Sequence, residues 1–130
     1  MEQAERVCVV VDDMFFAARI NTAAGAAGRP VERVRSRDQI EQEIIIDPPS
    51  LLIVDLNSER LDPLQTIEYF KSQSALSMVP IVGFVSHVQT DLIRRAQAAG
   101  CDYVLPRSAF TQLLPDIVSG NLDRLPRRSG

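Results

Sequence analysis

Leu52-Ile53-Val54-Asp55-Leu56-Asn57 is the stretch that decides the fold, because in it an unbroken apolar run ends on a carboxylate. The same pattern occurs earlier in the chain, in Val9-Val10-Val11-Asp12-Asp13. Apolar runs without polar alternation are typical of strands buried on both faces, as in a parallel sheet covered by helices. Both stretches therefore predict inner strands of a parallel sheet, each followed by acidic side chains.

Strands and helices are expected to alternate five times along the chain. The apolar runs and one alternating run predict strands at residues 7–11, 31–34, 51–54, 81–85 and 103–105, the second of them at a sheet edge. Helical patterns follow at 14–27, 38–46, 63–73 and 90–100, and a fifth helix is expected to start at a Ser108 cap and to be kinked or interrupted by Pro115. This order predicts an α/β domain, a doubly wound five-stranded parallel sheet with helices on both faces. We place it at residues 1–120, followed by a flexible tail or linker at 121–130.

Composition excludes several classes of protein. The chain has 130 residues with a net charge of −3 and aromatic residues at 5%, which gives no reason to expect nucleic-acid or anionic-membrane binding. No apolar stretch approaches the length of a membrane span, and the first residues do not resemble a signal peptide. Cys8 and Cys101 are expected to be reduced and buried, which fits a cytoplasmic protein.

Acidic side chains are expected to gather at one edge of the sheet. Asp12 and Asp13 follow the first strand, Asp55 ends the third, and Ser86 follows the fourth. The carboxyl ends of parallel strands meet at one edge, where such domains carry their functional groups. Carboxylates held close together repel one another unless a cation is present, and these oxygen ligands suit Mg²⁺. We therefore expect a Mg²⁺ site here, and expect Asp13→Asn to stabilise the metal-free protein.

Four motifs, in order, resemble those of the response-regulator receiver family. They are Val9-Val10-Val11-Asp12-Asp13, Leu52-Ile53-Val54-Asp55-Leu56-Asn57, Pro80-Ile81-Val82-Gly83-Phe84-Val85-Ser86 and Ala98-Ala99-Gly100-Cys101-Asp102-Tyr103-Val104. The resemblance covers about residues 6–118. It implies a flavodoxin-like fold and a signalling role in a phosphorelay, with a histidine kinase or downstream effector as protein partner.

The resemblance also implies roles for individual residues. Asp55 would be the phosphoacceptor, and Mg²⁺ would be held by Asp12, Asp13, Asp55 and the backbone carbonyl of Asn57. Ser86 and Tyr103 would form the switch pair. The partner and dimer face of the family would here carry Leu92, Arg95, Tyr103 and Phe110, which suggests a weak homodimer that Arg95→Glu would weaken.

The chain departs from the family pattern at a position that matters for phosphoryl transfer. Receivers carry a lysine after the fifth strand, whereas this chain reads Leu105-Pro106-Arg107. Counting from Tyr103 places Pro106 at the lysine position, and counting from Gly100 places Arg107 there. The only lysine, Lys71, lies on a predicted helix. These changes indicate an atypical or pseudo-receiver, with Arg107 as the candidate phosphoryl contact.

Simpler interpretations stay open for the same residues. Asp12 or Asp13 could cap the first helix, and Asp55 could satisfy loop amides. Ser86 and His87 are adjacent and lack a nucleophile elbow, so a hydrolase triad is not expected and the chain is not predicted to be an enzyme. Phe15 lies off the buried stripe of its helix and could mark a contact surface. The rival functions are a phosphorylation-independent interaction or dimerisation module and a small ligand-binding domain.

Overall fold

The sheet is the central layer of the molecule. The computed structural model describes residues 5–86 and 89–126. Its elements are β1 (Val7–Val10), α1 (Met14–Ala26), β2 (Val31–Arg33), α2 (Arg37–Gln39), the π-helix η1 (Ile40–Ile44), β3 (Leu51–Asp55), α3 (Pro63–Ser72), β4 (Ile81–Val85), α4 (Thr90–Ala99), β5 (Tyr103–Pro106), α5 (Arg107–Val118) and the 3-10 helix η2 (Leu122–Arg124). All strand pairs are parallel, in the order β2-β1-β3-β4-β5. The predicted doubly wound α/β fold is confirmed.

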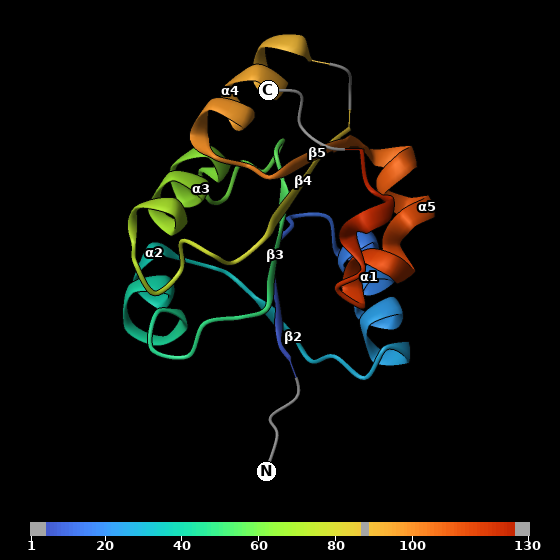
Figure 1. Ribbon diagram of the computed structural model, residues 1–130, viewed down its shortest axis with the longest axis horizontal. Coiled ribbons are helices and arrows are strands. Elements are labelled where there is room, and N and C mark those ends of the chain that lie inside the picture. Colours follow the sequence, from blue (N-terminus) through green and yellow to red (C-terminus); the bar gives the residue numbers. More distant parts are fainter. Residues whose placement is uncertain (1–4, 87–88, 127–130) are drawn as a thin grey trace.

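Helices cover both faces of the sheet, with α1 and α5 on one side and α2, α3 and α4 on the other (Figure 1). Each face has its own hydrophobic core, built around Phe16, Phe84 and Phe110 on the α1–α5 side and around Ile67 and Phe70 on the other. The middle strands contribute side chains to both cores because successive side chains point to opposite faces of the sheet. This explains why the strand sequences are apolar throughout.

Both cysteines lie in this interior as free thiols. Burial raises the pKa of Cys8 to about 11 and that of Cys101 to about 12. Neutral, buried thiols are unreactive, so both serve as core residues, as predicted. None of the helices in the described part of the chain has the length and hydrophobicity needed to span a bilayer.

Helix boundaries differ from the predictions at several points. The helix expected at 38–46 is a three-residue α-helix followed by a π-turn that ends at Ile44. Ser108 does not cap its helix, because α5 starts at Arg107, one residue before Ser108. Pro115 does not interrupt α5, which continues to Val118. Proline is tolerated there because the helix ends within one turn and its last apolar residues are buried.

The packed domain extends beyond the expected boundary at residue 120. Residues 122–124 form η2, and Leu125 is only 4% exposed in the α1–α5 core. The predicted flexible tail is therefore wrong for residues 121–126. Residues 127–130 lie outside the described part of the chain, as does His87.

Candidate functional site

The candidate site lies at the carboxyl edge of the sheet, where β1, β3, β4 and β5 end. The strand register aligns Val10 with Val54, and Asp55 with Phe84. Asp12 and Asp13 follow β1, Asp55 ends β3, and Arg107 begins α5 directly after β5. The three aspartates therefore lie at one edge of the sheet, as predicted, together with Arg107. Their side chains, however, contact different partners.

Asp12 is turned toward the loop between β3 and α3. Its carboxylate accepts hydrogen bonds from the Ser58 hydroxyl (2.8 Å) and from the backbone N–H groups of Glu59 (2.8 Å) and Arg60 (3.4 Å). Partial burial acts to raise the pKa of Asp12, but these hydrogen bonds outweigh it and lower the pKa below its usual value. Asp12 thus holds a loop, a role that no sequence signal indicated.

Asp13 has two structural partners. Its Oδ1 accepts from the backbone N–H groups of Phe15 (2.9 Å) and Phe16 (3.3 Å), so it caps α1, as the simpler interpretation allowed. Its Oδ2 accepts from Arg107 Nη2 at 3.1 Å. The hydrogen bond from Arg107 is the main cause that lowers the pKa of Asp13. The Arg107 guanidinium also lies over the Phe16 ring, 4.1 Å from its centroid, which fixes the position of this cation.

Asp55 is the half-buried carboxylate of the group. Its Oδ1 accepts a hydrogen bond from the Asn57 backbone N–H at 2.9 Å. Burial raises its pKa most, and the negative charges of Asp12 and Asp13 add to this, while the Asn57 N–H and Arg107 act against it. Asp55 is therefore the one aspartate of the edge whose ionised form the fold disfavours.

Asn57 connects the ends of β3 and β4 through its side chain. Its Oδ1 accepts from the Ser86 backbone N–H (2.8 Å), and its Nδ2 donates to Gln89 Oε1 (2.7 Å). Ser86 itself is exposed at the end of β4. The Asn57 backbone thus contacts Asp55, and the Asn57 side chain bridges to Ser86, a contact that was not predicted.

In the orientations that the side chains adopt, the carboxylate oxygens of Asp12, Asp13 and Asp55 do not form a set of ligands for a divalent cation. Both oxygens of Asp12 and both oxygens of Asp13 already accept from protein donors. Within residues 5–86 and 89–126, no three His, Cys, Asp or Glu side chains lie close enough together to hold a metal ion. The expected oxygen cage of Asp12, Asp13, Asp55 and the Asn57 carbonyl is therefore not formed, because amides and Arg107 satisfy the carboxylates instead.

At the end of β5, the structure places the charge of Arg107 beside the acidic edge. Pro106 is the last residue of β5, paired with Val85, and Arg107 is the residue whose charge reaches the acidic edge. Lys71 cannot serve there. Its Nζ pairs with Asp102 (3.0 Å), which also accepts from the N–H of Ile81 at the amino end of β4, the opposite edge of the sheet.

Only some of the residues expected to form the partner face are exposed at the surface. Arg95 is exposed and Leu92 and Tyr103 are partly exposed, but Phe110 is fully buried in the α1–α5 core, so its assignment to this face is wrong. The helical period places Phe110 toward the sheet, where Phe84 stacks on it at 4.5 Å between ring centroids. Phe15, in contrast, is 90% exposed next to the acidic edge.

Asp55→Asn is expected to stabilise the protein at pH 7, whereas Asp13→Asn is expected to destabilise it. The raised pKa of Asp55 means that its contribution to stability is present at low pH and is lost as pH rises through the folded-state pKa. The lowered pKa of Asp13 gives the opposite dependence. The stability that ionised Asp13 contributes is present above its unfolded-state pKa and is lost as pH falls through its folded-state pKa.

The measurement is chemical unfolding of both variants between pH 3 and pH 7, around the ordinary aspartate pKa of about 3.9. We expect a gain below about 1 kcal/mol for Asp55→Asn at neutral pH, since solvent screens a half-buried carboxylate, and we expect that gain to vanish at acid pH. Stabilisation by Asp13→Asn, as the sequence alone suggested, would contradict the ion pair with Arg107.

Several solved structures that are similar to this chain are response regulators. The chain is similar to a putative response regulator from Chloroflexus aurantiacus, with a TM-score of 0.78 and 21% identity over 94% of this chain and 100% of that one. It is also similar to chemotaxis protein CheY4 of Vibrio cholerae, with a TM-score of 0.76 and 16% identity over 92% and 100% of the two chains. A third match is the Mn²⁺-bound form of response regulator Rcp1, with a TM-score of 0.75 and 15% identity over 96% and 99%.

The class of the molecule follows from its strand order and its acidic edge: it is a doubly wound α/β domain of the flavodoxin-like type. Within that class, its fold is the response-regulator receiver fold. No protein-family model matches the chain, and no curated protein matches it.

Proposed function

We propose that this chain is a receiver-like signalling domain that acts by binding a protein partner, as a pseudo-receiver in which phosphoryl transfer to Asp55 is slow or lost. The observation that carries the proposal is the ion pair between Arg107 and Asp13, together with the hydrogen bonds that tie Asp12 to residues 58–60. Through these contacts, the protein itself supplies hydrogen-bond and ion-pair partners for the carboxylates of Asp12 and Asp13.

Charge is the physical reason for weak phosphoryl transfer. Transfer relies on positioning and on cations that neutralise the charge spreading over the equatorial phosphoryl oxygens. Arg107 is the cation that pairs with this edge, but Asp13 and the Phe16 ring already hold it. Mg²⁺ would have to displace protein donors from Asp12 and Asp13 before it could bind there.

A second candidate function, slow phosphorylation of Asp55, is supported by the environment of that residue. Asp55 ends β3 in the half-buried position of a phosphoacceptor, and its charge is compensated only by the Asn57 N–H and, at longer range, by Arg107. In this version Arg107 would release Asp13 and contact the phosphoryl group, because a guanidinium binds phosphate well.

The proposed partner is a protein, either a histidine kinase or a downstream effector. Support comes from the exposed Met14 and Phe15, 62% and 90% exposed, which follow Asp13 directly at the start of α1. Large apolar side chains exposed next to charged groups are typical of interaction sites. Leu92, Arg95 and Tyr103 are a second candidate contact surface, for a partner or for a weak homodimer.

The experiment that tests this function is intact-mass measurement after incubation with a small phosphodonor and Mg²⁺, with Asp55→Asn as the matched control. The proposal expects little or no added phosphoryl mass in the unmodified protein. Rapid and complete labelling that Asp55→Asn abolishes would instead establish an active receiver.

A further inference from the structure

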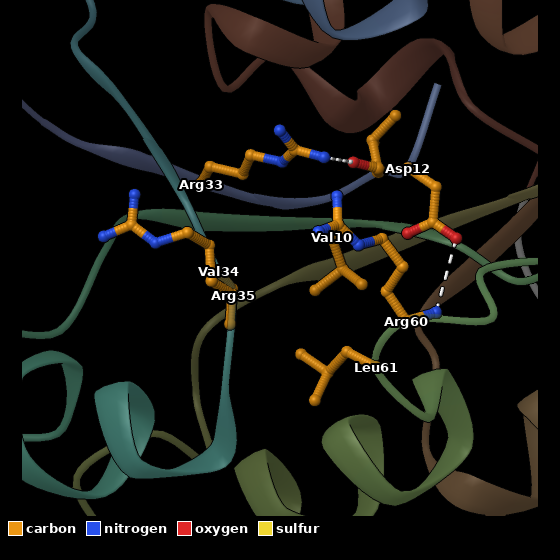
Figure 2. Close-up of a pocket in the computed structure, with 8 residues that line it drawn as sticks. Val10, Asp12, Arg33, Val34, Arg35, Arg60 and Leu61 are labelled. Carbon is orange, nitrogen blue, oxygen red and sulfur yellow. Dashed lines mark hydrogen bonds between the residues drawn. The ribbon is translucent and has the colours of Figure 1, made fainter. Parts of the chain in front are cut away.

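A cavity of about 290 Å³ lies on the side of the acidic edge away from Arg107, between the ends of β1 and β2 and the loop before α3. Its apolar lining includes Val10, Val34 and Leu61, of which the two valines are 1% and 4% exposed. Three arginines surround this lining, Arg33 and Arg35 from the end of β2 and Arg60 from the loop before α3 (Figure 2). An apolar floor with a few convergent charged groups is the usual composition of a small-molecule site.

The cavity has an excess of positive charge. Among residues 5–86 and 89–126, the ion pairs involve neither Arg33, Arg35 nor Arg60. Asp12 is the acidic residue in the lining, so the guanidiniums of Arg33 and Arg60 against one carboxylate leave an excess of one positive charge. Figure 2 shows the Arg60 side chain extended over Val10 toward Arg33, while Arg35 points away from them. Two like charges directed at one space favour an anion between them.

The arginines stand on a rigid support. Arg33 Nη2 donates to the Val11 carbonyl (3.1 Å), which fixes the guanidinium at the end of β1. Gln39, only 8% exposed, donates to the Arg33 carbonyl (3.0 Å) and accepts from the Arg35 N–H (2.7 Å). On the other wall, the Arg60 backbone N–H donates to Asp12. The Arg33 guanidinium and the backbone at Arg35 and Arg60 are therefore held in place before any ligand binds, which lowers the entropic cost of binding.

We propose that this cavity binds a small phosphate-bearing molecule, with the phosphate between Arg33 and Arg60 and the rest of the molecule on Val10, Val34 and Leu61. Guanidinium groups match phosphate oxygens with paired hydrogen bonds, and the negative charge of a phosphate group offsets the excess positive charge. The volume lies at the lower end of ligand pockets, so the ligand is the size of a sugar phosphate, not of a dinucleotide. This inference does not depend on the function proposed for Asp55.

The test is calorimetric titration of the full chain with ribose 5-phosphate, with inorganic phosphate and ribose as separate arms. We expect saturable binding of ribose 5-phosphate, weaker binding of inorganic phosphate, and none of ribose. Equal affinity for the phosphate ester and inorganic phosphate would assign the site to the free ion. No saturable heat with either phosphate compound at millimolar concentration would overturn the proposal.

Arg33→Gln and Arg60→Gln should each weaken binding at least about tenfold, which corresponds to about 1.4 kcal/mol. Arg94→Gln is the matched control because Arg94 is exposed on α4, on a different element, and it should leave affinity unchanged. Arg60 lies on an exposed loop, so its variant should fold even if Arg33→Gln does not. If Arg94→Gln weakens binding as much as Arg60→Gln, the binding is non-specific and the cavity is not the site.

Discussion

Phe110→Ala should lower the free energy of unfolding by about 3–5 kcal/mol, the range for removing a buried aromatic side chain. Phe110 is fully buried, stacks on Phe84 at 4.5 Å and lies 5.7 Å from Phe16 between ring centroids. The loss combines the transfer of the ring with the cavity left behind. Since domains of this size are stable by about 5–15 kcal/mol, this single change should bring the protein close to unfolding.

Urea unfolding measures this loss, and Arg95→Glu is the control. Arg95 is exposed on α4, so its replacement should leave unfolding nearly unchanged and should alter only the self-association seen in ultracentrifugation. A loss below about 1 kcal/mol for Phe110→Ala would return Phe110 to the surface, where the family resemblance placed it.

Arg107→Ala should make the melting temperature respond to Mg²⁺, which the unmodified protein should not do. Without the guanidinium, Asp13 loses its partner while Asp12 and Asp55 still contribute negative charge nearby. A divalent cation is then the available means of neutralising the edge. At ten times its dissociation constant, Mg²⁺ would add about 1.4 kcal/mol, a shift of several degrees for a domain of this size.

Melting curves over a Mg²⁺ series measure the effect, with Arg94→Ala as a control that removes an equal charge from an exposed position on α4. An equal Mg²⁺ response in the unmodified protein and in Arg107→Ala would contradict the role of Arg107 as the internal cation. An equal response in Arg94→Ala and Arg107→Ala would show that net charge, not this edge, governs the effect.

The sequence predicted the sheet well because its signals are local. The apolar runs that end at Asp12 and Asp55 required burial on both faces, and parallel strands then place their carboxyl ends together. Pro115 was expected to kink or interrupt the helix, but it removes only one backbone hydrogen bond, and the burial of Ile117 and Val118 holds the last turn of α5 in place.

The arrangement of the site could not be predicted because it depends on side-chain directions across distant segments. Ser58 lies 46 residues from Asp12, and Arg107 lies 94 residues from Asp13. The same carboxylates could face a metal ion or their own loops, and sequence spacing does not distinguish the two. The cavity arginines were missed for the same reason, since β2 and the loop before α3 supply them separately.

We propose that internal contacts satisfy the acidic edge, so that Asp55 is at most a poor phosphoacceptor. The most direct test is the time course of intact mass with a small phosphodonor and excess Mg²⁺, comparing the unmodified protein, Asp55→Asn and Arg107→Ala. The account predicts little or no added phosphoryl mass in the unmodified protein. Fast, complete and Asp55-dependent labelling of the unmodified protein would contradict it, and its loss in Arg107→Ala would show that Arg107 had replaced the missing lysine.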